Sequence, residues 1–89
     1  MRTAAQPLPS DEQPPRFRRF DEAYNWLADH GWRQVGASRG SHFRMEHPAY
    51  SKPLFLIYKR AATWGPYQQV QLTKRLGLLE RRYRRDAET

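Results

Sequence analysis

The sequence predicts an α+β domain in the order α-β-β-β-α, in which a three-stranded antiparallel sheet carries two helices on one face. Three observations predict this class. An amphipathic helical pattern lies near each end of the chain, three short strand-like runs lie between them, and turn-forming glycines and prolines separate these runs. The chain has 89 residues, which is enough for one small domain.

Residues 1–15 are predicted to be a disordered leader, because they hold four of the seven prolines and almost no large apolar side chain. The domain itself is expected over residues 16–80. Residues 81–89 are predicted to be a basic C-terminal tail, which either stands apart or continues the last helix.

The first helix is predicted from about Phe20 to His30. Its apolar face has the helical spacing i, i+3, i+4, i+7 and consists of Phe20, Ala23, Tyr24 and Leu27. Gly31 supplies a left-handed stop. His30 lies in the last turn and is expected to have a structural role, because an imidazole suits the carbonyl end of a helix.

Three strands are predicted over residues 32–35, 41–46 and 54–58. The second strand alternates between two faces, one with His42, Arg44 and Glu46 and the other with Ser41, Phe43 and Met45. The second face is the apolar one, so His42 is expected to point away from the core. His47 is expected to serve the turn that leads into the third strand.

The second helix is predicted to begin at Pro66, a favoured residue for a first helical position. Its apolar stripe consists of Leu72, Leu76, Leu79 and Tyr83, and all four are expected in the core. Gly77 either ends the helix near Leu76 or is tolerated inside a longer one at a cost of about 1 kcal/mol. Trp26 and Trp64 are expected at the edge of the core.

The chain is strongly basic, with a formal net charge of +7 and a pI near 10.4. Such a balance indicates an anionic partner, and its many arginines suit phosphate, which they bind through two hydrogen bonds at once. No cysteine is present, which excludes disulfides and cysteine-based zinc sites. No apolar run of about 18 residues and no signal-peptide core appear, so a soluble, cytoplasmic protein without a membrane partner is expected.

Neither a metal nor another cofactor is expected. His42 and Glu46 share a strand face, but four residues separate them, which is about 13 Å along a strand. That separation is too long for one ion without ligands from elsewhere. No phosphate-binding glycine motif and no Ser/His/Asp arrangement appears.

Several short motifs resemble the HicA toxin family, the small ribonucleases of HicA–HicB toxin–antitoxin pairs. Gly31-Trp32 follows the first helix, Gly40-Ser41-His42 opens the second strand, and His47-Pro48 closes it. A helical Leu76-Gly77-Leu78 segment is also similar. The resemblance covers roughly residues 20–79. The Pro-x-His ending that many members carry after the third strand is replaced here by Tyr58-Lys59-Arg60.

This resemblance implies a fold like that of double-stranded-RNA-binding domains and metal-independent cleavage of mRNA. It also implies a catalytic histidine in the Gly-Ser-His motif, which is His42, and neutralisation by a HicB-like antitoxin protein. The chemistry of RNA fits such a residue. Cleavage by the 2′-hydroxyl needs a base of near-neutral pKa, and imidazole, with an ordinary pKa of about 6.5, is the side chain suited to it.

The same chemistry needs cations for the phosphate. Arg39 and Arg44 flank His42, Gly40 lets the backbone approach closely, and Ser41 is placed to bond a phosphate oxygen. The full set predicted to bind RNA is Arg39, Gly40, Ser41, Arg44, Lys59, Arg60, Lys74 and Arg75. The proton donor for the leaving group stays open between Tyr58, Lys59 and water.

Two other functions stay open at this point. The first is a non-catalytic RNA-binding module that uses the same basic surface, which the missing Pro-x-His ending favours. The second is an interaction protein whose basic face docks an acidic partner. Salt-sensitive RNA binding separates these two alternatives from each other.

Overall fold

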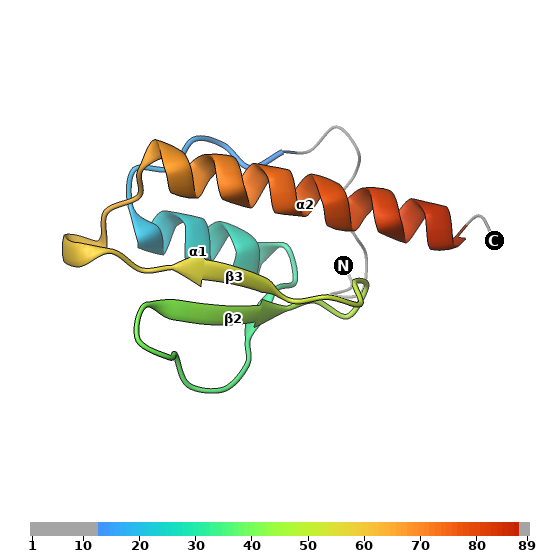
Figure 1. Cartoon of the computed structure of the whole chain (residues 1–89), viewed down its shortest axis with the longest axis horizontal. Helices are drawn as coiled ribbons and strands as arrows, with labels where there is room; N and C mark the ends of the chain where they lie inside the picture. Colours follow the sequence, from blue (N-terminus) through green and yellow to red (C-terminus); the bar gives the residue numbers. More distant parts are fainter. Residues whose placement is uncertain (1–12, 88–89) are drawn as a thin grey trace.

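The computed structural model describes residues 13–87, so most of the predicted leader lies outside the described residues. The elements follow the order α1 (Phe20–Asp29), β1 (Arg33–Gln34), β2 (His42–Glu46), β3 (Leu54–Ile57), the short 3-10 helix η1 (Arg60–Ala62) and α2 (Pro66–Ala87). The strands form one antiparallel sheet in the order β1-β2-β3. Both helices lie on the same side of this sheet (Figure 1). The predicted α+β class and its α-β-β-β-α order are confirmed.

The core lies between the helices and the inner face of the sheet. Ala23 and Leu27 of α1 are fully buried, because the helical spacing of the apolar residues turns them toward the sheet. The other fully or nearly fully buried residues of this core come from the end of the α1–β1 turn, from β2 and β3 and from α2: Trp32, Met45, Leu54, Leu56, Leu72 and Leu76. Trp64 belongs to this core and Trp26 packs against it, as expected for both.

Helix α2 continues through Gly77 to Ala87, so the basic tail is its last two turns as far as residue 87. The expected core position of Tyr83 is wrong. Tyr83 is 36% exposed, and its ring meets the Tyr50 ring edge to face, with the ring centroids 6.0 Å apart. Figure 1 shows the reason, because the end of α2 extends beyond the sheet. The apolar stripe of α2 therefore extends further along the helix than the core that it packs against.

Two of the three histidines have structural roles, as expected. The His30 ring packs against the Trp26 ring in a tilted arrangement with centroids 4.0 Å apart, and its Nδ1–H donates to the Trp26 carbonyl at 2.7 Å. His47 is buried, and its Nδ1 accepts the backbone N–H of Ala49 at 3.0 Å. Its Nε2–H is thereby left to donate to the His30 carbonyl, also at 3.0 Å. These bonds join the end of α1 to the turn after β2.

Two neighbouring glutamines of α2, Gln68 and Gln69, form hydrogen bonds to other segments of the chain that the sequence pattern does not reveal. Gln68 is buried, and its Nε2 donates to the Ile57 carbonyl at 2.7 Å while its Oε1 accepts the Gly65 N–H. Gln69 Oε1 accepts both the Phe17 N–H and the Trp64 indole N–H. Its Nε2 donates to the Pro15 carbonyl. The segment before α1 is thus attached to α2 by hydrogen bonds.

Candidate functional site

The Gly-Ser-His motif forms a tight turn. The Arg39 N–H donates to the His42 carbonyl at 3.1 Å, and the His42 N–H donates to the Arg39 carbonyl at 3.0 Å. Gly40 has a φ of +58°, whereas Ser41 is not among the residues with positive φ. A two-residue hairpin turn with positive φ at its first central position has the type II′ pattern, which favours glycine there. The turn geometry therefore explains why a glycine stands at position 40 without reference to any ligand.

This turn decides which side chains share a face. Residues that exchange both backbone hydrogen bonds lie directly opposite each other, so Arg39 and His42 project to the same side of the sheet. Arg44 lies two residues further along β2 and joins them. His42 and Arg44 are exposed and Met45 is fully buried, which confirms the predicted faces of this strand. Arg39, His42 and Arg44 thus share the open face of the sheet.

These side chains line an open hollow of about 740 Å³, here called the sheet hollow. Its other walls are the loop of residues 35–38 and the ring of Phe55 on β3. Phe55 is the backbone partner of Arg44 across the sheet and is 43% exposed. The Arg44 guanidinium carbon lies 5.9 Å from the centre of this ring, and Arg44 Nε is 2.9 Å from Glu46 Oε2.

Phe55 was not among the residues predicted for the site. The apolar run of residues 54–58 contains no polar residue before Tyr58, so it does not show which members face outward. The available signal was the period of two, since the partners of an alternating strand must alternate as well. Leu54 and Leu56 are buried, and Phe55 between them faces the open side.

Three further predicted residues lie where β3 ends, close to the turn. The Tyr58 N–H donates to the Ser41 carbonyl at 2.7 Å. The Tyr58 ring, however, packs on Phe20 of α1 at 5.1 Å, on the helix side of the sheet and away from the imidazole. Lys59 and Arg60 follow with exposed side chains. Of the three possible proton donors, Lys59 and water therefore fit the His42 face better than Tyr58.

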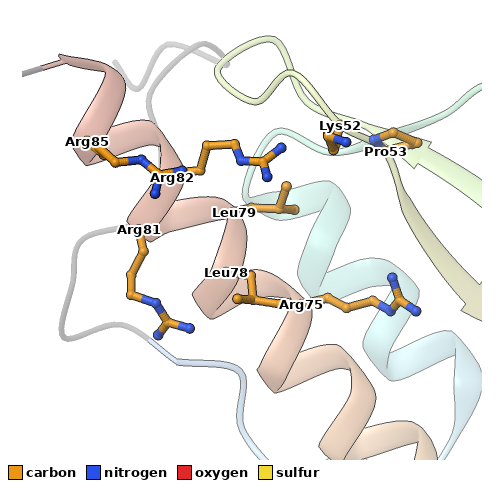
Figure 2. Close-up of a pocket in the computed structure, with 8 residues that line it drawn as sticks. All are labelled: Lys52, Pro53, Arg75, Leu78, Leu79, Arg81, Arg82 and Arg85. Carbon is orange, nitrogen blue, oxygen red and sulfur yellow. The ribbon is translucent and has the colours of Figure 1, made fainter. Parts of the chain in front are cut away.

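Lys74 and Arg75 are not brought together with His42. Both lie on α2, which covers the opposite face of the sheet (Figure 1). Arg75 lines a second hollow of about 470 Å³, here called the α2 hollow. Figure 2 shows its walls, with arginines and leucines from α2 on one side and the turn before β3 on the other: Lys52, Pro53, Arg75, Leu78, Leu79, Arg81, Arg82 and Arg85.

The α2 hollow carries more charge than the sheet hollow. Five cations line it, and within residues 13–87 none of the five takes part in an ion pair. The nearby Glu80 instead pairs with Arg84, one helical turn away, at 2.8 Å. Leu78, which lies among these arginines, is 50% exposed. This face combines strong positive charge with apolar surface, but no histidine is among the residues that line it.

Within the described part of the chain, no three side chains of metal-binding type gather at one place. No helix between residues 13 and 87 is both long and apolar enough to cross a membrane. None of the family models, curated proteins and solved structures compared with this chain matches it.

Proposed function

We propose that this protein is a metal-independent RNA endonuclease that acts on mRNA in the cytoplasm, with His42 as its general base. The observation that carries the proposal is the hairpin turn, which projects Arg39 and His42 to one face beside Arg44. This array offers a base between two cations on an accessible surface. The resemblance to the HicA family adds the expectation that the protein is the toxin of a toxin–antitoxin pair.

The proposed reaction uses the nucleophile of RNA itself. His42 removes the 2′-hydroxyl proton, and the resulting oxygen attacks the adjacent phosphorus. The bond from phosphorus to the 5′-oxygen breaks, and that oxygen takes a proton from Lys59 or water. The products are a 2′,3′-cyclic phosphate and a 5′-hydroxyl. Arg39 and Arg44 bind the non-bridging oxygens, on which negative charge develops in the transition state.

The proposal also includes a protein partner, a HicB-like antitoxin. An antitoxin that neutralises a chain with a net charge of +7 is expected to be acidic where it binds. Co-expression tests this part. A cognate antitoxin should restore growth and co-purify with the chain, whereas unchanged toxicity with every acidic neighbour of its gene would remove the antitoxin from the account and leave the ribonuclease standing.

Induced expression in a bacterial host tests the function as a whole. Wild type, His42→Ala and Tyr67→Ala are expressed at matched levels, and growth and total RNA are followed. Tyr67 is an exposed side chain on α2 outside the sheet hollow, so its variant controls for mutation alone. We expect growth arrest and loss of mRNA for wild type and Tyr67→Ala only. Healthy growth and intact RNA in all three strains would contradict the proposal.

The second function, an RNA-binding module without catalysis, has one observation in its favour. Among the residues that line the sheet hollow, His42 is the only one with an imidazole side chain and none has a carboxyl group, so no second side chain suited to proton transfer stands beside it there. The binder predicts that the wild type retains RNA without cleaving it. It also predicts that His42→Ala changes affinity no more than any other exposed polar substitution on this face.

A further inference from the structure

Phe55 is an exposed aromatic ring in a place where an exposed ring needs an explanation. It lies in the sheet hollow, and 43% of its surface is accessible. Its neighbours on β3, Leu54 and Leu56, are buried, so the strand has enough apolar contact on its inner face without it. Phe55 contributes little to the core and presents its ring beside the proposed catalytic group.

The guanidinium of Arg44 extends this aromatic surface. It lies over the ring at 5.9 Å, and its Nε is held by Glu46, which leaves the remaining N–H groups of the fork for a ligand. Planar guanidinium groups and aromatic rings are the two surfaces on which proteins stack nucleobases. Phe55 and Arg44 together therefore make a stacking platform of mixed aromatic and cationic character.

We infer that Phe55 and Arg44 form a subsite for one unpaired nucleobase, and that the substrate is therefore single-stranded RNA at the cleaved bond. This inference rests on the proposed ribonuclease function and names its substrate class. A base in a duplex is covered on both faces by its neighbours and cannot stack on a protein ring without leaving the helix. The platform therefore favours single-stranded over double-stranded RNA, although the expected fold is like that of double-stranded-RNA-binding domains.

The register of the sheet places this subsite beside the catalytic group. Arg44 is opposite Phe55 and His42 is opposite Ile57, so His42 and Phe55 are diagonal neighbours on one face. Diagonal neighbours in an antiparallel pair lie about 7–8 Å apart. This spacing is comparable to the reach from a nucleobase to its own phosphate. A base on Phe55 would therefore bring the adjoining phosphate to Arg39, Arg44 and His42.

Charge selects nucleic acid over an apolar peptide as the occupant. The titratable or charged residues that line the sheet hollow are two arginines and a histidine, and no acidic residue lines it. An apolar peptide would leave both guanidinium groups without a counter-charge, whereas RNA supplies a phosphate and a stackable base together. The combination of a basic surface and an aromatic platform is the general pattern of single-strand binding.

The test measures binding separately from cleavage. A fluorescein-labelled single-stranded RNA of mixed sequence, and the same RNA annealed to its complement, are titrated into His42→Ala, which keeps the RNA intact. In this background Phe55 is changed to Leu and to Tyr, and Tyr67→Leu is the matched control because Tyr67 is a more exposed ring, on α2. Fluorescence anisotropy gives the affinities and circular dichroism confirms that each variant folds.

We expect Phe55→Leu to bind the single strand about 5- to 150-fold more weakly, since one base–aromatic stack contributes in that range. Phe55→Tyr and Tyr67→Leu should bind like the parent, and the duplex should bind more weakly than the single strand. Equal affinity of the Leu and Tyr variants, or a preference for duplex, would overturn the subsite. The subsite would also be overturned if an acidic peptide displaced the labelled RNA and unlabelled single-stranded RNA did not. That result would assign the platform to a protein partner.

This design keeps two failures apart. If wild type cleaves RNA through His42 but Phe55→Leu leaves single-strand binding unchanged in the His42→Ala background, the ribonuclease stands and the subsite fails. If Phe55→Leu loses single-strand binding but no variant or wild type cleaves RNA, the subsite stands on a binding module and the ribonuclease fails.

Discussion

The sheet hollow and the α2 hollow are both basic, but the two regions hold their charges in different ways. In the sheet hollow, backbone hydrogen bonds of a tight turn and of a strand pair set the positions of Arg39, His42 and Arg44. In the α2 hollow, five cations extend from a helix face and a turn, and their long side chains take part in no ion pair within residues 13–87. The α2 hollow therefore has more positive charge, whereas the charged residues of the sheet hollow are more firmly positioned by the backbone.

This difference suits the sheet hollow to catalysis and the α2 hollow to electrostatic attraction of a ligand. Catalysis needs groups held at defined positions relative to the reacting atoms. A sheet register supplies such positions, whereas exposed lysines and arginines on a helix supply an attractive potential that salt screens. We therefore place the proposed RNA cleavage at the sheet hollow and expect the α2 hollow to affect its rate only through long-range attraction.

The largest expected effect comes from removing two charges on one face or on the other. Arg39→Gln with Arg44→Gln should lower the rate of RNA cleavage by about 100-fold or more, because each guanidinium is expected to stabilise the phosphorane charge. Lys74→Gln with Arg75→Gln removes the same charge from α2 and should change the rate by about threefold or less. Rates on one labelled RNA at fixed salt measure both. An equal loss of cleavage rate in the two double variants would show that the sheet hollow and the α2 hollow contribute to cleavage in the same way.

A smaller effect, of opposite sign in the two regions, is expected from adding a methyl group to a glycine. Gly40→Ala should lower the free energy of unfolding by about 1–2 kcal/mol, because Gly40 has a φ of +58° and alanine is strained there even though nothing lies within 4 Å of the new Cβ. Gly77→Ala should raise it by up to about 1 kcal/mol, because alanine is the better helix former and its Cβ would meet only Arg81 Nη1 at 3.6 Å.

Urea denaturation of both variants checks these signs. Gly40→Ala should also slow RNA cleavage beyond its effect on stability, because the turn sets Arg39 against His42. Gly77→Ala should leave cleavage unchanged. A Gly40→Ala protein that is as stable and as active as wild type would show that the turn does not position the site.

The smallest effect concerns the salt dependence of binding. For single-stranded RNA the logarithm of the affinity falls with the logarithm of the salt concentration by about 0.7 for each phosphate contact. Removing Arg39 and Arg44 together should therefore reduce this slope by about 1.4. The Lys74 and Arg75 double variant should retain the wild-type slope. A reduced slope in the second variant would show that RNA also contacts α2, which would extend the binding surface around the molecule.

Much of the fold could be predicted because local patterns and tertiary structure agree. The helical spacing from Phe20 to Leu27 and the alternation of β2 each have one apolar face, and each face packs into the core, with Tyr24 and Phe43 partly buried at its edge. Tyr83 was misplaced because a stripe on a helix does not show where the sheet beneath it ends. The predicted grouping of Lys74 and Arg75 with the other RNA-binding residues had a similar origin, since charge in a sequence carries no information about which side of a sheet it will occupy.

The candidate site was predicted in part for the same physical reasons. His42 and Arg44 share a face by alternation within one strand, which a sequence reveals. Arg39 joins them through hydrogen bonds across a turn, and Phe55 joins them through the register of a second strand. Both of these depend on strand pairing. The roles of Gln68 and Gln69 in α2 were missed because their hydrogen-bond partners lie in other segments, such as the Ile57 carbonyl and the Phe17 N–H, which only the folded chain brings to them.

The most direct test of the central claim uses an oligonucleotide with a single ribonucleotide among deoxynucleotides, incubated with wild type and with His42→Ala in the presence of EDTA. The account predicts cleavage by the wild type only, on the 3′ side of the ribonucleotide, with a 2′,3′-cyclic phosphate end identified by mass spectrometry. It predicts a loss of about 100-fold or more in His42→Ala and no cleavage of the all-deoxy strand. An undiminished rate in His42→Ala, or equal cleavage of the all-deoxy strand, would contradict it.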